Sequence, residues 1–267
     1  MHTHSDNSPD GSHSVTFICE SAERRGLRGL ALTDHCECEE YAARRFDISV
    51  RNSYFESVKA QSIYSGRLII MAGVELGQPS QNPEAASGVL SQYDFDFVLA
   101  SLHNLAGQKD FYYMDYKKSE PREILGLYFS ELYELAAGCD YDVLAHLDYP
   151  LRYITGRDGI QVDLREYYDK IDRVLRAVIE RGKGIEVNTS GYRHPLGRSM
   201  PGEEIVRRYH ELGGVYITTG SDAHTGADVG RGLAAGMDII YAAGFRHTAL
   251  YKKRSPILIP IESDTNP

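Results

Sequence analysis

The sequence predicts an α/β barrel, and three observations support this fold class. Short apolar, β-branched runs alternate with longer amphipathic stretches, which is the pattern of repeated strand–helix units. Most of the apolar runs are followed directly by a residue that can bind a metal ion. The chain lacks both a GxGxxG motif after the first run and a GxxxxGKS/T motif, so the usual reasons for an open, nucleotide-binding sheet are missing and a barrel is favoured.

The elements follow in order from these periods. The predicted strands cover residues 27–33, 68–74, 95–102, 142–145, 184–187, 214–219 and 256–261. The predicted helices cover residues 14–25, 53–65, 121–137, 164–181, 202–212 and 227–243, and several are followed by a glycine that suits a C-cap. We interpret residues 78–91 and 104–119 as long surface loops and residues 262–267 as a frayed tail. No repeat or linker divides the sequence, so residues 1–267 are expected to form a single domain.

Composition narrows the class of protein. The 267 residues are 42% hydrophobic and 25% charged, which is typical of a globular chain with a sizeable core. A formal net charge of -9 argues against long nucleic acids as partners. The four cysteines form no CxxC pair, which indicates free thiols in a reducing cytoplasm, and Cys36 and Cys38 are read as ordinary thiols. No apolar run is long enough to span a membrane, and the oligomeric state has no sequence signature.

Candidate metal ligands stand where the predicted strands end. They are His35, Glu75, His103, His146, Glu186, Asn188, Asp222 and His224. His2 and His4 add two imidazoles on the same side of an extended segment. In a parallel barrel all strand carboxyl ends open on one face, so these side chains are expected to converge on one pocket. Histidines and carboxylates without thiolates suit Zn²⁺, Mn²⁺ or Fe²⁺, and the number of ligands predicts two or three ions with Glu75 shared between neighbours.

The remaining histidines and two of the tyrosines have weaker placements. His13 and His194 border the expected mouth of the pocket, whereas His210 and His247 are expected at the surface. The following list adds the tyrosines that flank ligand positions and are candidates for lining a substrate pocket: Tyr149 and Tyr192.

Taken in order, the motifs resemble those of the PHP (polymerase and histidinol phosphatase) superfamily. The matching segments are His-Thr-His-Ser from residue 2, Leu-Thr-Asp-His ending at 35, Gly-Val-Glu ending at 75, Ser-Leu-His ending at 103, Ala-His ending at 146, Glu-Val-Asn-Thr-Ser-Gly from 186 and Gly-Ser-Asp-Ala-His ending at 224. The chain length and the segments 146–152 and 186–193 are most similar to the histidinol-phosphate phosphatase branch.

The resemblance implies a distorted, seven-stranded, TIM-like (β/α) barrel with a trinuclear metal site. By position, one ion takes His2, His4, Glu75 and Asp222. A second ion shares Glu75 and takes His103 and His146. The third ion takes Asp10, His35 and His224.

The sequence departs from the family pattern in two places. Many relatives carry a histidine where Asp10 aligns, so the third ion is expected to have a harder ligand set or the site to favour Mn²⁺ or Fe²⁺ over Zn²⁺. The family usually has a short strand before its first His-x-His motif, yet His2 is the second residue here. Two explanations stay open, a start assigned too far downstream or a barrel that opens at its first strand.

Together these features predict a cytoplasmic metal-dependent phosphatase that acts on a small phosphorylated substrate, L-histidinol phosphate in histidine synthesis. A hydroxide between two ions is expected to attack phosphorus in line, with Asp222 orienting the water and His224 or His35 acting on the leaving alkoxide. Arg152 and Arg193 are expected to grip the phosphoryl oxygens, and His13 is a third candidate.

Several alternatives stay open at this point. Arg157 and Arg198 are alternates for the phosphate-binding arginines. The same pocket could serve another phosphomonoester or a nucleotide, and a non-catalytic metal-binding module is the reading from a different class.

Overall fold

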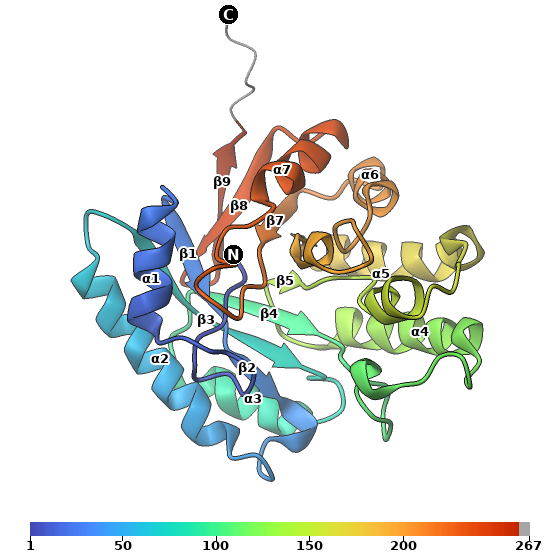
Figure 1. Cartoon of the computed structure of the whole chain (residues 1–267), viewed down its shortest axis with the longest axis horizontal. Coiled ribbons are helices and arrows are strands. Elements are labelled where there is room, and N and C mark those ends of the chain that lie inside the picture. The colour runs from blue at the N-terminus through green and yellow to red at the C-terminus, as the bar shows by residue number, and fades with distance from the viewer. Residues whose placement is uncertain (262–267) are drawn as a thin grey trace, which may run out of the picture.

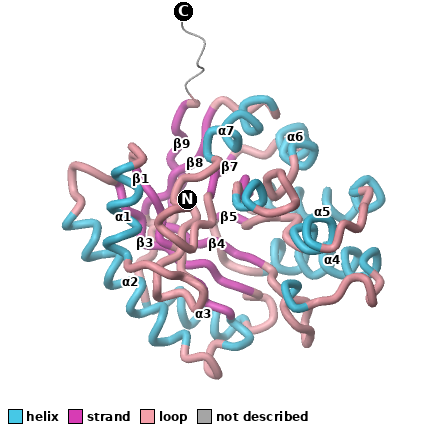
Figure 2. Tube along the Cα trace, viewed as in Figure 1, coloured by secondary structure: helices cyan, strands magenta, loops and turns pink. Residues whose placement is uncertain are grey.

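The computed structural model of the chain describes residues 1–261. Its main sheet contains β1 (Gly29–Leu32), β2 (His35–Glu37), β3 (Ile69–Gly77), β4 (Phe97–Ser101), β5 (Val143–Leu144), β6 (Gly184–Asn188) and β7 (Tyr216–Gly220). Neighbouring strands follow the order β1-β3-β4-β5-β6-β7, with β2 also pairing with β3. All of these pairings are parallel, and the sheet is curled with the helices around its outside (Figure 1; Figure 2). The barrel-like α/β class predicted from the sequence is therefore confirmed.

The strands form where the apolar runs predicted them. The first six predicted strands each overlap an observed one, and β2 is an addition that the sequence did not suggest. All five residues of β4 and of β6 are buried, because side chains on one face of the sheet meet helices and those on the other face fill the barrel interior. The polar strand ends therefore mark where the chain leaves this packed interior.

The helices are α1 (Val15–Arg24), α2 (Phe46–Ile63), α3 (Pro83–Gln92), α4 (Pro121–Gly138), α5 (Tyr168–Glu180), α6 (Glu203–Glu211) and α7 (Leu233–Ala242). Helix α5 shows why they form, since it buries Ile171, Val174, Leu175 and Val178 at the spacing of one helical face. The oxygen of Ser14 accepts a hydrogen bond from the Phe17 N–H and caps α1. Within residues 1–261, no helix combines the length and hydrophobicity needed to cross a membrane.

Residues 2–4 lie between the ends of β1 and β7. The carbonyl of Thr3 accepts a hydrogen bond of 2.9 Å from the N–H of Thr33, next to β1. On the other side the N–H of His4 donates to the carbonyl of Ala223 over 2.9 Å, just past β7. This extended segment thus occupies the place between the two edge strands and carries His2 and His4 into the sheet's carboxyl end.

The last predicted strand has a different place from the one expected. Residues 256–261 were expected in the barrel, but β9 (Ser255–Pro260) pairs antiparallel with β8 (His247–Lys252) in a separate hairpin. Tyr251 of this hairpin packs against Phe97 with ring centroids 5.0 Å apart, in a cluster that also contains barrel-interior side chains. The hairpin therefore covers the interior near the starts of the strands. The predicted tail, residues 262–267, lies outside the described residues.

Three predicted boundaries are wrong for local reasons. Residues 78–91 were expected to be a loop, but α3 begins there with Asn82 accepting a hydrogen bond from Ala85 N–H and with a proline in its first turn. Helix α7 starts six residues later than predicted, because Gly230 and Gly232 have φ values of +74° and +78°. Helix α2 starts at Phe46, ahead of the predicted residue 53.

Candidate metal centre

The structure brings the predicted ligands together around one cavity. They come from the N-terminal segment, from strands β2 and β3, and from the segments that follow β4, β5 and β7. The side chains of this ligand cluster are His2, His4, Asp10, His35, Glu75, His103, His146, Asp222 and His224. Convergence follows from topology, since parallel strands all end on the same side of the sheet.

Glu75 lies at the centre of the ligand cluster. Its Oε1 is 3.1 Å from Nε2 of His146 and 3.3 Å from Nε2 of His103. Its Oε2 is 3.2 Å from Nε2 of His2 and 3.0 Å from Nδ1 of His35. Because each oxygen faces a different group of imidazoles, this carboxylate is placed to be shared between two ions.

His2, His4 and Asp222 form one side of the cluster. The Nε2 atoms of the two histidines are 3.0 Å apart, and both rings are fully buried. Oδ1 of Asp222 is 3.3 Å from Nε2 of His4 and 3.6 Å from Nε2 of His2. Two imidazole nitrogens and a carboxylate oxygen that face one another at these distances form a donor set for a single cation.

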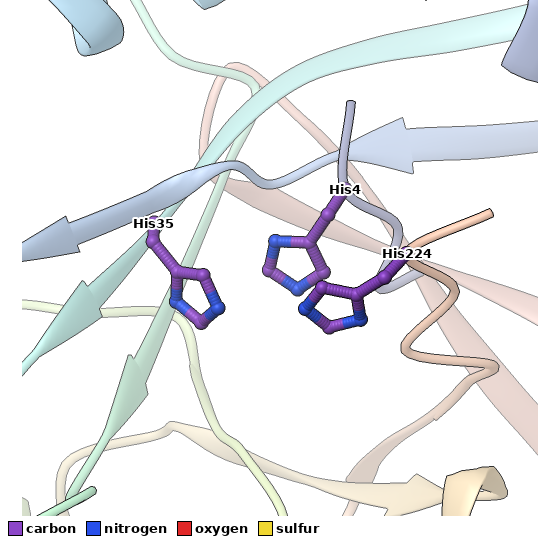
Figure 3. Close-up of side chains that lie close together, drawn as sticks. All are labelled: His4, His35 and His224. Carbon is purple, nitrogen blue, oxygen red and sulfur yellow. The ribbon is translucent and has the colours of Figure 1, made fainter. Parts of the chain in front are cut away.

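His35 and His224 form the side nearest the solvent, where their rings lie beside that of His4 (Figure 3). The centroid of the His4 ring is 4.3 Å from that of His35 and 4.1 Å from that of His224. Asp10 reaches both outer rings, with oxygens 3.0 Å from Nε2 of His224 and 3.7 Å from Nε2 of His35. These contacts match the third donor set expected from the sequence.

Burial and neighbouring charges act against each other throughout the cluster. Burial opposes a charge on His2, but Glu186 and Glu75 raise the pKa of this ring well above its usual value. Burial would raise the pKa of the Glu75 carboxyl, yet His2 and His35 hold it well below its usual range. Burial, assisted by the neighbouring His224 and His35, lowers the pKa of His4 to about 4. The site therefore holds ionised carboxylates beside closely packed imidazoles, as a cation site requires.

The residues present fit divalent metal ions. Nδ1 of His146 and Nε2 of His224 are buried and have no hydrogen-bond partner, so they keep lone pairs or protons unsatisfied in a polar interior. His146 and Asp222 have φ values of +23° and +48°, in a region that costs energy for residues other than glycine. Such strain is typical of residues whose side chains must be aimed at a functional centre.

Hydrogen bonds at Nδ1 aim two of the rings. Nδ1 of His4 donates to Oγ of Ser8 over 3.0 Å, and this hydroxyl donates in turn to Asp34 over 2.8 Å. Nδ1 of His103 donates to Oε1 of Glu37 over 3.1 Å. In both cases the bond fixes the tautomer, so that Nε2 is the nitrogen free to bind a cation.

The cluster opens into a cavity of 1640 Å³. Arg152, Arg193 and His194 line it beside the ligands. Nη2 of Arg193 donates to the carbonyls of Ser221 and Asp222 over 2.8 and 3.0 Å, while its buried Nη1 has no partner. Among residues 1–261, Arg152 forms no ion pair, and its guanidinium lies 5.7 Å from the ring centroid of Tyr153. Burial and the two guanidinium charges lower the pKa of His194 to about 4.

Other predicted residues are used elsewhere. The structure does not bring His13 to the cavity, because its ring stacks on Phe17 and its Nδ1 accepts a hydrogen bond from the N–H of Gly226. Arg157 pairs with Asp158, and Arg198 pairs with the buried Asp148, so neither alternate arginine faces the cavity centre. The expected surface histidines, His210 and His247, are exposed.

The tyrosines divide in the same way. Tyr149 lines the cavity and packs its ring 5.1 Å from that of His103 and 4.8 Å from that of His146. Tyr192 does not line the cavity and is partly exposed.

Sequence reasoning missed the acidic wall of the cavity. Its members are Glu37, Glu39, Glu40, Asp110, Glu131 and Glu134. They come from the turn after β2, the loop after β4 and the face of α4, so no spacing in the sequence connects them. The one available signal was Glu37, which stands two residues after His35 on the same side of an extended strand.

A curled parallel sheet with a buried histidine–carboxylate cluster at the carboxyl ends of its strands defines the class of barrel-like proteins built for metal-dependent hydrolysis. Within this class, the chain belongs to the PHP domain family, which it matches over residues 1–190.

Relatives within the family are similar over nearly the whole chain. A probable histidinol-phosphatase from Clostridium acetobutylicum is 31% identical over 232 residues, which cover 86% of this chain and 87% of the relative. A probable histidinol-phosphatase from Thermotoga maritima is 27% identical and covers 95% of this chain and 96% of its own length.

A solved structure shows the same fold. It is the crystal structure of histidinol phosphate phosphatase from Lactococcus lactis complexed with zinc, L-histidinol and phosphate. It superposes with a TM-score of 0.75 at 22% identity and covers 96% of this chain and 97% of that one.

Proposed function

We propose that this chain hydrolyses L-histidinol phosphate to L-histidinol and phosphate. The Clostridium acetobutylicum and Thermotoga maritima relatives carry the name of this activity, and the Lactococcus lactis structure holds both products of the reaction. Hydrolysis breaks the bond between phosphorus and the alcohol oxygen, while water supplies the new oxygen on phosphorus and the proton on histidinol.

One observation carries the proposal more than any other. The ligand cluster and the unpartnered Nη1 of Arg193 line the same cavity. A phosphate monoester is a dianion, so a site that hydrolyses it must bind several oxygens with positive groups and bring a nucleophile to phosphorus. Cation ligands beside a free guanidinium donor meet both needs.

The ligand cluster divides into three donor sets that share members. His2, His4 and Asp222 would hold one ion, with Oε2 of Glu75 nearby. His103 and His146 would hold a second ion through Oε1 of Glu75. A third set consists of His35, His224 and Asp10. Bound divalent ions would supply hydroxide at neutral pH and offset the charge of the phosphoryl group.

The protein's own side chains would bind and orient the substrate. Arg193, fixed to the carbonyl of Asp222, presents Nη1 to a phosphoryl oxygen, and Arg152 supplies a second guanidinium from the neighbouring wall. Asp222 would orient the attacking water through a carboxylate oxygen. His224 and His35, the ligands nearest the solvent, are placed to pass a proton to the leaving alkoxide.

The acidic wall suits the leaving alcohol. L-Histidinol carries an ammonium group and an imidazole ring, so it is cationic near neutral pH. Asp110 and Glu37 lie on the wall of the same cavity that holds the ligand cluster. A substrate with an anionic end and a cationic end would thus meet arginines at one side and carboxylates at the other.

Phosphate release from L-histidinol phosphate tests this function. We would measure it beside sugar phosphates and mononucleotides, using protein reconstituted separately with Zn²⁺, Mn²⁺ and Fe²⁺. We expect kcat/KM for L-histidinol phosphate to exceed the others and to reach about 10⁴ M⁻¹s⁻¹ or more. Preference for a nucleotide or a sugar phosphate would contradict the substrate but keep the hydrolytic chemistry. Bound metal without turnover of any substrate would overturn the enzymatic proposal.

A further inference from the structure

Glu186 is a buried carboxylate of β6 that the proposed reaction does not use. Its side chain is fully buried and accepts three hydrogen bonds. Oε1 accepts from Nδ1 of His2 over 2.9 Å. Oε2 accepts from the backbone N–H of His146 over 3.1 Å and from Nδ2 of Asn188 over 3.0 Å. All the donors that a buried carboxylate needs are therefore present, and two of them belong to residues of the ligand cluster.

The bond to His2 decides which nitrogen of that ring is free. A carboxylate can only accept here, so the proton of the neutral ring lies on Nδ1. The lone pair then lies on Nε2, the atom that is 3.0 Å from Nε2 of His4 and 3.2 Å from Glu75. Without this acceptor the ring would be free to carry its proton on Nε2 and lose its value as a ligand.

The bond to His146 acts on the backbone. His146 has a φ of +23°, and the N–H of this residue points to Glu186 from the neighbouring strand. The adjacent Gly220 leaves room for the carboxylate, because a Cβ at that position would overlap Oε1 of Glu186 and the Cβ of His2. The packing around β6 and β7 is thus built to hold this carboxylate at one place.

We propose that Glu186 is a positioning residue that aligns two ligands of different ions at once, His2 through its tautomer and His146 through its backbone. This inference rests on the proposed metal centre, though not on the identity of the substrate. A purely structural role would stabilise the fold without changing the affinity for metal.

Glu186→Gln separates the two roles. The amide oxygen can still accept from His146 and Asn188, while the NH₂ group faces Nδ1 of His2 and forces the proton of that ring onto Nε2. Asp142→Asn is the matched control. Asp142 is also buried and also accepts a backbone N–H, that of Val98, but it precedes β5 at the other end of the sheet.

Zinc binding is the readout, measured by competition with a chromogenic chelator and by metal content after dialysis. We expect Glu186→Gln to weaken the affinity for Zn²⁺ about 10- to 100-fold. The metal-free variant should melt close to the metal-free parent. In turnover, kcat should fall at limiting zinc and recover with excess zinc, while KM changes little. Asp142→Asn should bind zinc with the parent's affinity.

Equal zinc affinity in Glu186→Gln and the parent would overturn the proposal, as would an equal loss in Asp142→Asn. If Glu186→Gln does not fold, ¹⁵N NMR of ring-labelled, zinc-loaded parent protein decides the question. The proposal requires a proton on Nδ1 of His2 and zinc on Nε2, and zinc on Nδ1 would refute it. Because these measurements need no substrate, a failed phosphatase assay leaves them unaffected, and a failed zinc test leaves the substrate assay unaffected.

Discussion

Arg193 lies at the boundary between the ligand cluster and the open cavity. Two of its hydrogen bonds fix the guanidinium to backbone carbonyls beside Asp222, and the remaining Nη1 has no partner. A buried donor without a partner costs free energy, so its orientation toward a cavity indicates that a bound anion satisfies it.

Arg193→Ala should therefore raise KM for L-histidinol phosphate roughly 10- to 100-fold, the loss of one charge-assisted contact, with a smaller change in kcat. Steady-state kinetics on metal-loaded protein check this. Arg165→Ala is the control, because Arg165 is exposed and pairs with Asp163 outside the cavity. Unchanged kinetics in Arg193→Ala would remove this residue from the phosphate site.

Asp110 tests the acidic wall. Its oxygen caps the short turn Phe111–Tyr113 by accepting from the N–H of Tyr112 over 2.6 Å, and asparagine can keep that bond. Asp110→Asn thus removes charge alone. We expect KM for L-histidinol phosphate to rise roughly fivefold, about 1 kcal/mol, while KM for p-nitrophenyl phosphate stays unchanged, because its leaving group has no cation.

The control for this comparison is Asp115→Asn, which changes an exposed carboxylate that does not line the cavity. A similar rise in KM for both substrates in Asp110→Asn would show that the wall does not distinguish leaving groups.

At the scale of elements, the β8–β9 hairpin depends on Arg254 at its turn. This side chain contacts Oδ1 of the buried Asp142 over 3.0 Å and Oδ2 of Asp140 over 2.8 Å. Removal of Arg254 leaves a buried carboxylate without its cation, which is costly.

Arg254→Met should lower the free energy of unfolding by about 2 kcal/mol, or roughly 5 °C in Tm, since the arginine is partly exposed. Calorimetry checks this value. Arg246→Met in the segment before β8 is the control, because Arg246 bonds only to nearby carbonyls. Equal melting of both variants would contradict the anchoring role.

The same contact predicts a pH dependence. The hydrogen bond from Arg254 holds the pKa of Asp140 below its usual value. A carboxyl with a depressed pKa adds stability above its unfolded pKa of about 3.9, and this contribution is lost as the pH falls through the folded value. Asp140→Asn should therefore melt slightly below the parent at pH 7, and the difference should shrink below about pH 4. A difference that grows on acidification would contradict this sign.

Some elements were predictable from local sequence and others were not. The buried strands β3 and β4 are long apolar runs, so their positions follow from composition. Helix α3 also had a local signal, Asn82 followed by proline and glutamate, which is a helix start that the loop interpretation missed. The strand β9 was found as a strand but assigned to the wrong sheet, because pairing depends on contacts that its own residues do not encode.

At the scale of the whole molecule, the ligand cluster joins segments from residue 2 to residue 224. Any ion bound by several of these segments favours the folded chain, because the unfolded chain has no such site.

Chelation should therefore destabilise the protein. At metal concentrations about a thousandfold above Kd the linkage is about 4 kcal/mol, so EDTA should lower Tm by roughly 10 °C. His103→Ala should show a smaller shift, whereas His247→Ala, which changes an exposed histidine, should keep the full shift. A Tm that does not respond to EDTA would argue against tightly bound ions.

The sequence by itself determined the order of strands and helices and the set of candidate ligands. Both depend on local properties, since apolar period marks the strands and parallel topology brings their ends together. Only the tertiary structure decided that Arg193 rather than Arg198 has a free donor, that His13 lies away from the cavity, and that Glu186 faces His2. Side-chain direction and ion pairing depend on neighbours far away in the chain, and no short stretch of sequence contains that information.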